Sequence, residues 1–361
     1  MVRISKSHLL AGSAAVGLAA FTANSPALAQ SDATGLYVDT TSYQLTVEEG
    51  ETLSSAANAV VIVSPDVVVI NAGMIDGGNY GINSQLTFNA ETEQYDAPAA
   101  GVEIRNSGLV VGRNNDGIRL EGGGTVINDG LIEGQLGLQT DGVSMFPGPV
   151  QANADYTAVV SNLEGGSIAG DRFGVILSGG GNIDNAGDIS GMAGGVLVQG
   201  IALNSAEGED RAGVVGIVTN TGTIRGLGPA DSDGYGVAFG SDLGEATLVN
   251  SGIISSASSY GVSQRSSAEL LIQNLSGGSI TGATSGIYSG SGSITIENAG
   301  TIRGNGIYDG FDAAPDAGIT IATGASSVVN SGTISGAGAG ITTAYVYDAE
   351  ADALVGLATG T

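Results

Sequence analysis

The chain contains no cysteine and no tryptophan, and beyond residue 8 it contains no lysine and no histidine. Without cysteine there is no disulfide framework and no thiolate-ligated metal. Without histidine, a serine nucleophile lacks the base that usually activates it. Without lysine, and with few arginines, the clustered positive charge that binds nucleic acid or anionic membrane surfaces is missing.

Charge of the other sign is abundant, because the formal net charge is −26. All 36 carboxylates lie after residue 30, whereas Arg3 and Lys6 precede it, so removal of the first residues shifts the charge to −28. This balance argues against nucleic acid as a partner and fits solubility outside the cell. No later segment is apolar and long enough to predict a membrane-spanning helix.

Residues 1–29 have the pattern of a secretory signal peptide. Arg3 and Lys6 supply the charged start, and the apolar core runs over Leu9–Phe21. Ala27 and Ala29 form a small-x-small cleavage site. We therefore expect cleavage between Ala29 and Gln30 and export of the remaining chain.

One short phrase recurs ten times and organises the rest of the sequence. It consists of an apolar residue, any residue, Asn, a Gly turn, any residue, and Ile or a close relative, as in Val328–Ile334. Two copies carry two extra turn residues, in Asn162–Ile168 and Asn274–Ile280. A phrase at constant phase indicates a repeat architecture. The repeated asparagines are Asn71, Asn106, Asn128, Asn162, Asn185, Asn220, Asn250, Asn274, Asn298 and Asn330.

The shortest spacings between these asparagines are 22–24 residues, and each unit contains three short apolar segments separated by Gly-rich corners. Apolar side chains such as Val262 and Ile272 are predicted to point inward, and no segment has helical periodicity. The sequence therefore predicts an all-β, right-handed three-sided parallel β-helix of about 11–13 rungs. We assign residues 30–60 to N-terminal cap strands, 61–343 to the β-helix, and 344–361 to an incomplete final rung or the start of a downstream region.

The ten asparagines have a structural interpretation that we favour over a ligand row. Asn tolerates the left-handed backbone conformation, and its side-chain amide can hydrogen-bond to the rungs above and below it. Stacked at one corner, the side chains would form a continuous ladder.

The longer spacings contain insertions, which concentrate aromatic and acidic residues. Three lie before the Asn-bearing strand and two after the strand that follows it. We expect the first three to leave one edge at every second rung, about 10 Å apart. They are either tolerated, solvated loops or a ligand-facing surface. The insertions are Thr87–Ala99, Phe146–Asp155, Ile201–Arg211, Leu227–Asp233 and Asn305–Asp316, and the candidate ligand-facing residues are Phe88, Tyr95, Phe146, Tyr156, Tyr308 and Phe311.

Metal and catalytic signatures are weak. Asp231–Gly234 and Asn114–Gly117 resemble fragments of calcium loops but lack the remaining ligands, and Asx turns also explain them. We therefore expect no cofactor, with calcium left open. The segment Gln139–Gly142 resembles one piece of the polygalacturonase Asn-Thr-Asp motif, with Gln139 in place of Asn. The other polygalacturonase motifs are missing, and no arginine and carboxylate constellation typical of pectate lyases is visible, so we predict that the protein is not an enzyme.

The Asn-Ser-Gly-Thr-Ile type of repeat over residues 60–343, the signal peptide and the acidic, cysteine-free composition together resemble the passenger region of bacterial autotransporters. This resemblance implies a surface-exposed adhesin or stalk, and an outer-membrane β-barrel translocator. The sequence stops at Thr361 without barrel-like strands after the repeats, so we expect it to be part of a longer product or a truncated gene.

Three functions stay open on the sequence. The first is adhesion or surface contact through a loop-bearing face, with a host or environmental surface, glycans included, as partner. The second is a secreted polysaccharide lyase or glycoside hydrolase on a pectin-lyase-like β-helix. The third is a structural stalk, for which no loop matters. The sequence predicts a location at the cell surface, in the outer membrane or outside the cell, and leaves the oligomeric state undetermined.

Overall fold

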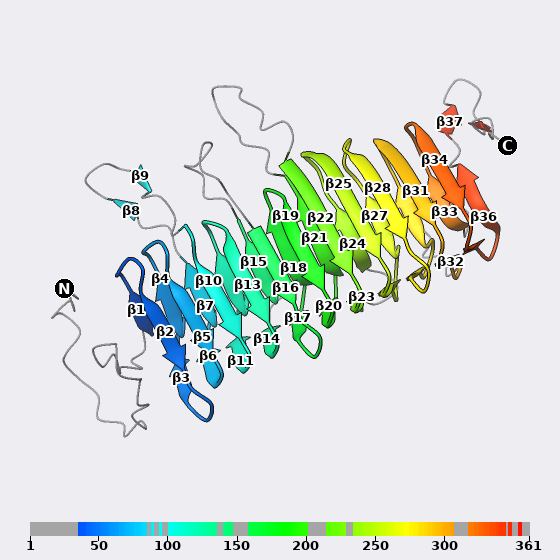
Figure 1. The fold of residues 1–361 in the computed structure, drawn as a ribbon. Coiled ribbons are helices and arrows are strands. Elements are labelled where there is room, and N and C mark those ends of the chain that lie inside the picture. Colours follow the sequence, from blue (N-terminus) through cyan, green and yellow to red (C-terminus); the bar gives the residue numbers. More distant parts are fainter. Residues whose placement is uncertain are drawn as a thin grey trace.

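The protein is a three-sided parallel β-helix, and in the computed structural model its strands stack into a long rod (Figure 1). Each turn of the chain contributes one strand to each of three parallel sheets, here called A, B and C. The strands cross the long axis of the rod, and β1 and β36 lie at its opposite ends. The structure describes residues 35–84, 88–89, 94–95, 100–135, 140–146, 158–200, 214–228, 234–306, 317–343, 346–348 and 353–355.

Sheet A has twelve strands among the described residues, paired in parallel with their neighbours from successive turns. They are β1 (Leu36–Val38), β4 (Val60–Ile62), β7 (Ile82–Ser84), β12 (Ile118–Leu120), β15 (Val143–Met145), β18 (Phe173–Ser178), β21 (Gly194–Gln199), β24 (Tyr235–Phe239), β27 (Val262–Gln264), β30 (Ile287–Ser289), β33 (Ala317–Ile321) and β36 (Ala339–Thr343).

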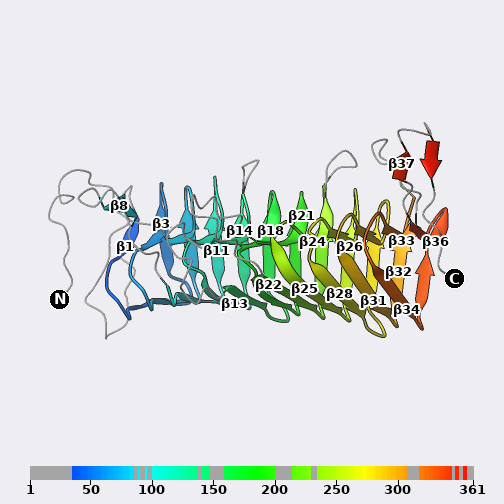
Figure 2. The same cartoon turned by 90° about the horizontal axis from the view of Figure 1, so that it is seen from above.

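Sheet B has eleven described strands and runs along one side of the rod in Figure 2. From β5 onward each of them ends on one of the ten repeated asparagines. They are β2 (Gln44–Val47), β5 (Val68–Asn71), β10 (Glu103–Asn106), β13 (Gly124–Asn128), β16 (Ala158–Asn162), β19 (Gly181–Asn185), β22 (Val214–Asn220), β25 (Leu243–Asn250), β28 (Glu269–Asn274), β31 (Ser293–Asn298) and β34 (Ser326–Asn330).

Sheet C also has eleven described strands, which follow the asparagine turns. They are β3 (Thr52–Ser55), β6 (Met74–Gly77), β11 (Leu109–Gly112), β14 (Leu131–Gly134), β17 (Ser167–Gly170), β20 (Asp188–Gly191), β23 (Thr223–Gly226), β26 (Ile253–Ser256), β29 (Ser279–Gly282), β32 (Thr301–Gly304) and β35 (Thr333–Ser335). Two antiparallel pairs lie apart from the three sheets, β8 (Phe88–Asn89) with β9 (Gln94–Tyr95) and β37 (Val346–Asp348) with β38 (Ala353–Val355).

The core fills the space between the three sheets, and it is built from one or two apolar side chains per strand. Ile189 in sheet C, Val262 in sheet A and Ile272 in sheet B are all fully buried, which confirms that the alternate apolar positions point inward. A strand of four or five residues buries too little apolar surface to stand alone, but stacking places each side chain against its equivalents above and below. The part of the chain that the structure describes contains no helix, and hence none that could cross a membrane.

The segment assigned to a cap contributes β1, β2 and β3, one strand to each sheet. Leu36 pairs with Val60, Leu45 with Val69, and Leu53 with Ile75, all in parallel register. This segment thus makes a turn of the same coil and occupies the outer edge of all three sheets. Residues 1–34, with the expected signal peptide and the Ala29–Gln30 cleavage site, lie outside the described residues.

The order of the strands shows where the insertions leave the coil. Three of them connect sheet A to sheet B, after β7, β15 and β21, which are alternate strands of sheet A. The other two connect sheet C to sheet A, before β24 and β33. All five insertions therefore join the coil at one of the two corners that border sheet A. Sheet A is thus the sheet flanked by insertions on both sides.

Candidate functional site

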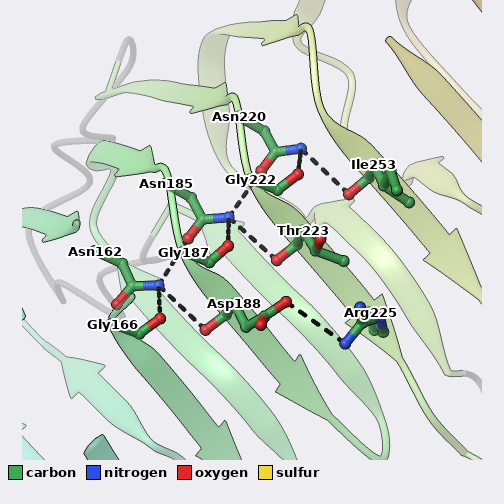
Figure 3. A network of polar contacts seen from close by, with 10 residues as sticks. All are labelled: Asn162, Gly166, Asn185, Gly187, Asp188, Asn220, Gly222, Thr223, Arg225 and Ile253. Carbon is green, nitrogen blue, oxygen red and sulfur yellow. Dashed lines mark hydrogen bonds and ion pairs between the residues drawn. The ribbon is translucent and has the colours of Figure 1, made fainter. Parts of the chain in front are cut away.

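The repeated asparagines form a hydrogen-bonded ladder along one corner of the rod (Figure 3). Each side-chain amide donates to the Oδ1 atom of the next asparagine, and the nine N···O distances are 2.7–2.8 Å. The amide of Asn185 also donates to the carbonyl of Gly187 in its own turn and to that of Thr223 on the next rung, both at 3.1 Å. The ladder uses every donor of the amide, so it holds the corner rather than binding a ligand.

The backbone of these asparagines differs from the expected left-handed conformation. Among the described residues other than glycine, only Ser42, Asp66 and Asp242 have a positive φ. In the longer turn after Asn162 that role falls to Gly165, with φ of 93°. The asparagines complete a strand and contribute their side chains instead.

The ladder ends at Asn71, the first of the ten asparagines in the chain. The position that pairs with Asn71 is Val47, which has no side-chain donor, so the buried Oδ1 atom of Asn71 has no hydrogen-bond partner. A buried acceptor without a partner lowers stability, and here it marks the rung at which the repeat phrase begins.

The outer face of sheet A differs from a solvated sheet surface because many of its outward side chains are buried. Val61, Asn83, Ser144, Ala238 and Ser263 are each at most 4% exposed. Their strand neighbours on either side point into the core, so these five point away from it. An outward face this well covered, bordered by all five insertions, is the candidate functional site.

A charged cluster occupies this face over the consecutive strands β12, β15 and β18. Two nitrogen atoms of Arg172 contact the two carboxylate oxygens of Asp141, at 3.0 and 2.5 Å, and the backbone N–H of Phe173 donates to the same carboxylate at 3.1 Å. Asp116 accepts from the backbone N–H of Asp141 at 2.8 Å and from the hydroxyl of Ser144. Three successive turns of the chain are thus connected through buried carboxylates.

Burial raises the pKa of both carboxyl groups. The pKa of Asp116 rises to about 6, first because it is desolvated and second because the charge of Asp141 is close. Desolvation also raises the pKa of Asp141, although the hydrogen bonds and the charge of Arg172 oppose this effect. Asp116 has no comparable ion pair among its described contacts, and with a pKa of about 6 it changes its charge near that pH.

Arg119 lies beside this cluster and connects it to aromatic side chains. Its guanidinium carbon is 4.8 Å from the centre of the Phe146 ring and 5.9 Å from the centre of the Tyr80 ring. Its Nη2 atom is 3.1 Å from Glu121. Arg172 similarly lies 5.7 Å from the ring centre of Phe173. Cations over aromatic faces hold these rings on the outer face of sheet A.

Further along the same face, three tyrosines form a stack. The ring centres of Tyr235 and Tyr260 are 6.2 Å apart, those of Tyr260 and Tyr288 are 4.5 Å apart, and the rings are nearly parallel. Arg265 lies over Tyr235 at 4.7 Å. With Ala238 they form a second apolar cluster, separate from the core between the sheets. Tyr235 and Tyr260 are almost fully buried, so this stack serves packing.

Three of the six candidate ligand-facing residues lie among the described residues. The structure places Phe146 on the outer face of sheet A, in contact with Arg119. Phe88 and Tyr95 are paired positions in the antiparallel strands β8 and β9. Tyr156, Tyr308 and Phe311 lie outside the described residues, as does the fragment Asp231–Asp233.

In the fragment Asn114–Gly117, the carboxylate of Asp116 accepts hydrogen bonds from the next rung, from the backbone N–H of Asp141 and the hydroxyl of Ser144. Asp116 therefore connects two rungs and does not form a local Asx turn. No cluster of three or more potential metal ligands is found among the described residues. The segment Gln139–Gly142 contributes Asp141, which is paired with Arg172 and only 1% exposed.

Sequence reasoning did not find the Asp116, Asp141, Arg119 and Arg172 cluster, although a signal for it exists. In sheet A the residue before a recurrent Gly occupies one row on successive rungs, which includes Tyr80, Asp116, Asp141 and Phe173. The Gly is required there, because a Cβ atom at Gly117 would lie 2.8 Å from the carbonyl oxygen of Gly142. Aligning the chain on these glycines, rather than on the asparagines, would have shown the row.

Comparison of the chain with protein-family models, with curated proteins and with solved structures finds no significant match.

Proposed function

We propose that this protein is a non-enzymatic, exported β-helix that makes surface contacts through the outer face of sheet A. One observation carries the proposal: four successive turns bring the aromatic rings of Tyr80, Phe146 and Phe173 and the guanidiniums of Arg119 and Arg172 onto that one face. Aromatic and arginine side chains held on a rigid scaffold are typical of recognition surfaces.

The carboxylates on this face support contact rather than chemistry. A catalytic acid or base must reach the substrate. Asp141 is held by Arg172 and by a backbone N–H, and both oxygens of Asp116 accept hydrogen bonds. These groups fix the shape of the face and leave recognition to their neighbours.

Binding of the full chain to surfaces tests the proposal. We expect the fluorescently labelled protein to bind cultured epithelial cells or bacterial cells, and the double variant Arg119→Gln, Phe146→Ala to lose most of that binding. The matched control is Arg105→Gln on the outer face of sheet B, since Arg105 also lies beside a glutamate two residues away. Equal losses in both variants, or no binding by the parent protein, would contradict the proposal.

We further propose presentation at the cell surface in the manner of an autotransporter passenger, supported by the β-helix and the expected signal peptide. Cell fractionation with an antibody to residues 204–213 tests this. A band well above 35.4 kDa in the outer membrane, with a protease-released surface fragment, is expected. A band near the mature size, free in the periplasm or medium, would refute it.

A second candidate function is hydrolysis or cleavage of a polysaccharide. The observation in its favour is the pair Asp116 and Asp141, because acid and base catalysis of glycoside hydrolysis uses two carboxyl groups, of which the acid has a raised pKa, as Asp116 has. Product release from neutral and acidic polysaccharides, with and without calcium, tests it. Release that disappears in Asp141→Ala while folding persists would establish the enzyme. Absence of products would leave the contact function.

A further inference from the structure

Asn83 is a polar residue on the outer face of sheet A whose burial the fold does not compensate with a hydrogen bond to Oδ1. It is 2% exposed, and its Oδ1 atom has no hydrogen-bond partner. It points outward from β7, because Ile82 and Ser84 on either side are buried toward the core. A buried acceptor without a donor costs stability, so a group that donates to it when bound would recover that loss.

The neighbours of Asn83 provide complementary contacts. Arg119 pairs with Asn83 on the adjacent strand, and Glu121 follows two positions later on the same outward side, with its backbone N–H bonded to Ser84. The rings of Tyr80 and Phe146 lie near the guanidinium of Arg119. The site therefore combines an acceptor without a partner, a planar donor, a carboxylate and two apolar ring faces within three rungs.

The charge of the cluster limits the ligand. Three carboxylates, Asp116, Glu121 and Asp141, accompany two guanidiniums, and the whole protein has a net charge of −26. An anionic ligand would meet repulsion from the molecule as a whole. A neutral ligand with several hydroxyl groups and an apolar face satisfies all the groups present, since a hydroxyl both donates and accepts.

We propose that Asn83, Arg119 and Glu121, with the rings of Tyr80 and Phe146, form a subsite for a neutral saccharide. Once the groups that bury it have moved aside, the Oδ1 atom of Asn83 accepts a hydrogen bond from a sugar hydroxyl. Other hydroxyls bond to Arg119 and Glu121, and the C–H face of the sugar packs on an aromatic ring. This inference rests on the proposed contact function and names the ligand class that its face recognises.

The test is affinity electrophoresis of the full chain in native gels that contain dextran, glucomannan or arabinogalactan, with polygalacturonate as the acidic comparison. The informative variant is Asn83→Leu, which has nearly the same volume and removes the orphan oxygen. We expect its stability to be equal or higher and its affinity for the retarding polysaccharide to fall on the order of tenfold. Arg119→Gln should lose affinity similarly.

The matched control is Ser263→Ala, because Ser263 also carries a buried oxygen without a hydrogen-bond partner on the outer face of sheet A, on β27. Its substitution should leave retardation unchanged. The subsite is refuted if no neutral polysaccharide retards the parent protein, if Asn83→Leu is retarded as strongly as the parent, or if only polygalacturonate retards it. If labelled protein still binds cells under those outcomes, the saccharide inference fails while the contact function stands.

Discussion

At the scale of single residues, an asparagine side chain recurs at the same corner of ten successive rungs. In the eight asparagines from Asn106 to Asn298, the side-chain amide donates both to a backbone carbonyl of its own turn and to one on the next rung, as in Asn185. In a water-excluded corner such bonds reinforce one another, and the loss of one member leaves its neighbours without partners. The position of the residue in the stack therefore determines how much it contributes.

Replacing Asn185 with Ala should destabilise the protein by about 2–4 kcal/mol, because the buried Oδ1 atom of Asn220 loses its donor and two backbone carbonyls each lose one hydrogen bond. Among the described residues, Asn330 donates only to its own turn, and it is exposed, so Asn330→Ala should cost about 1 kcal/mol or less. Urea unfolding of the two variants measures the difference. Equal losses would mean that the ladder adds nothing beyond the turn.

The raised pKa of Asp116 predicts a pH dependence. Since the folded protein holds this proton up to about pH 6, whereas an ordinary aspartate releases it near pH 3.8, the folded state binds more protons in between. Stability from this group should therefore rise as pH falls from about 6 to 4, by roughly 3 kcal/mol at most.

Asp116→Asn isolates this effect from the titration of the other carboxylates. Its amide can donate to the Ser144 hydroxyl and still accept from the backbone N–H of Asp141. We expect the variant to exceed the parent in stability at pH 7 and to approach it at pH 4, in urea unfolding at both values. A variant that is less stable at pH 7 would show that the charged form of Asp116 is required.

At the scale of elements, no strand stands alone, and contacts between rungs define the structure. Besides the backbone ladders, buried side chains join neighbouring turns, as Arg172 does when it reaches back to Asp141. Because both charges lose hydration on folding, the ion pair adds little net stability. Removing one partner is nevertheless costly, because the other charge stays buried without a counter-charge.

Arg172→Gln should cost about 3 kcal/mol, because the Asp141 carboxylate remains buried without its counter-charge. Asp141→Asn in the same chain should recover part of that loss. In a double-mutant cycle measured by urea unfolding we expect a coupling of roughly 1–3 kcal/mol. Additive losses in the double variant would indicate that Arg172 contributes through packing on Phe173 and not through the ion pair.

Core strands provide a second test at this scale. Ile189→Asp places a charge in the fully buried stack of sheet C and should lower stability by several kcal/mol. Ile253→Asp is the control, because Ile253 lies on the outer side of the same sheet and is 50% exposed. A near-unchanged melting temperature in Ile189→Asp would refute the inward assignment of this row.

At the scale of the whole molecule, the rod is a one-dimensional stack in which each rung contacts only its neighbours. Interior rungs gain from two interfaces, whereas a rung at the edge of the described stack gains from one. Ile341, in the last turn of the three sheets, is 47% exposed, whereas Ile319 and Ile287 at the equivalent position of the two preceding rungs are fully buried. Local stability should therefore vary along the axis.

Hydrogen exchange of the full chain measures this gradient. We expect backbone amides of the central strands, such as β19 and β20, to exchange slowest, and those of β34 and β36 to exchange orders of magnitude faster, because opening an edge rung requires breaking one interface. Uniform protection along the rod would contradict a nearest-neighbour stack and indicate a single cooperative unit.

Much of the fold follows from the sequence, because its repeat has a fixed phase. The Asn-to-Asn distances give the length of a rung, and the alternation around Val262 and Ile272 gives the inward positions. The candidate site follows only in part. Phe146 was named from its insertion, but Arg119, Asp141 and Arg172 are scattered by 22 to 53 positions, and nothing local identifies them as neighbours.

The sequence by itself determined the three-sided coil, the phase of its strands and the corners at which the insertions leave, since these depend on residue type and spacing along the chain. Only the tertiary structure decided that Asp116, Asp141, Arg119 and Arg172 meet on the outer face of sheet A, and that Asn83 is buried there without a donor. The physical reason is that the stacking of rungs makes neighbours of residues that are far apart in the chain. The burial that results removes water from their polar groups and shifts the pKa of the carboxyl groups.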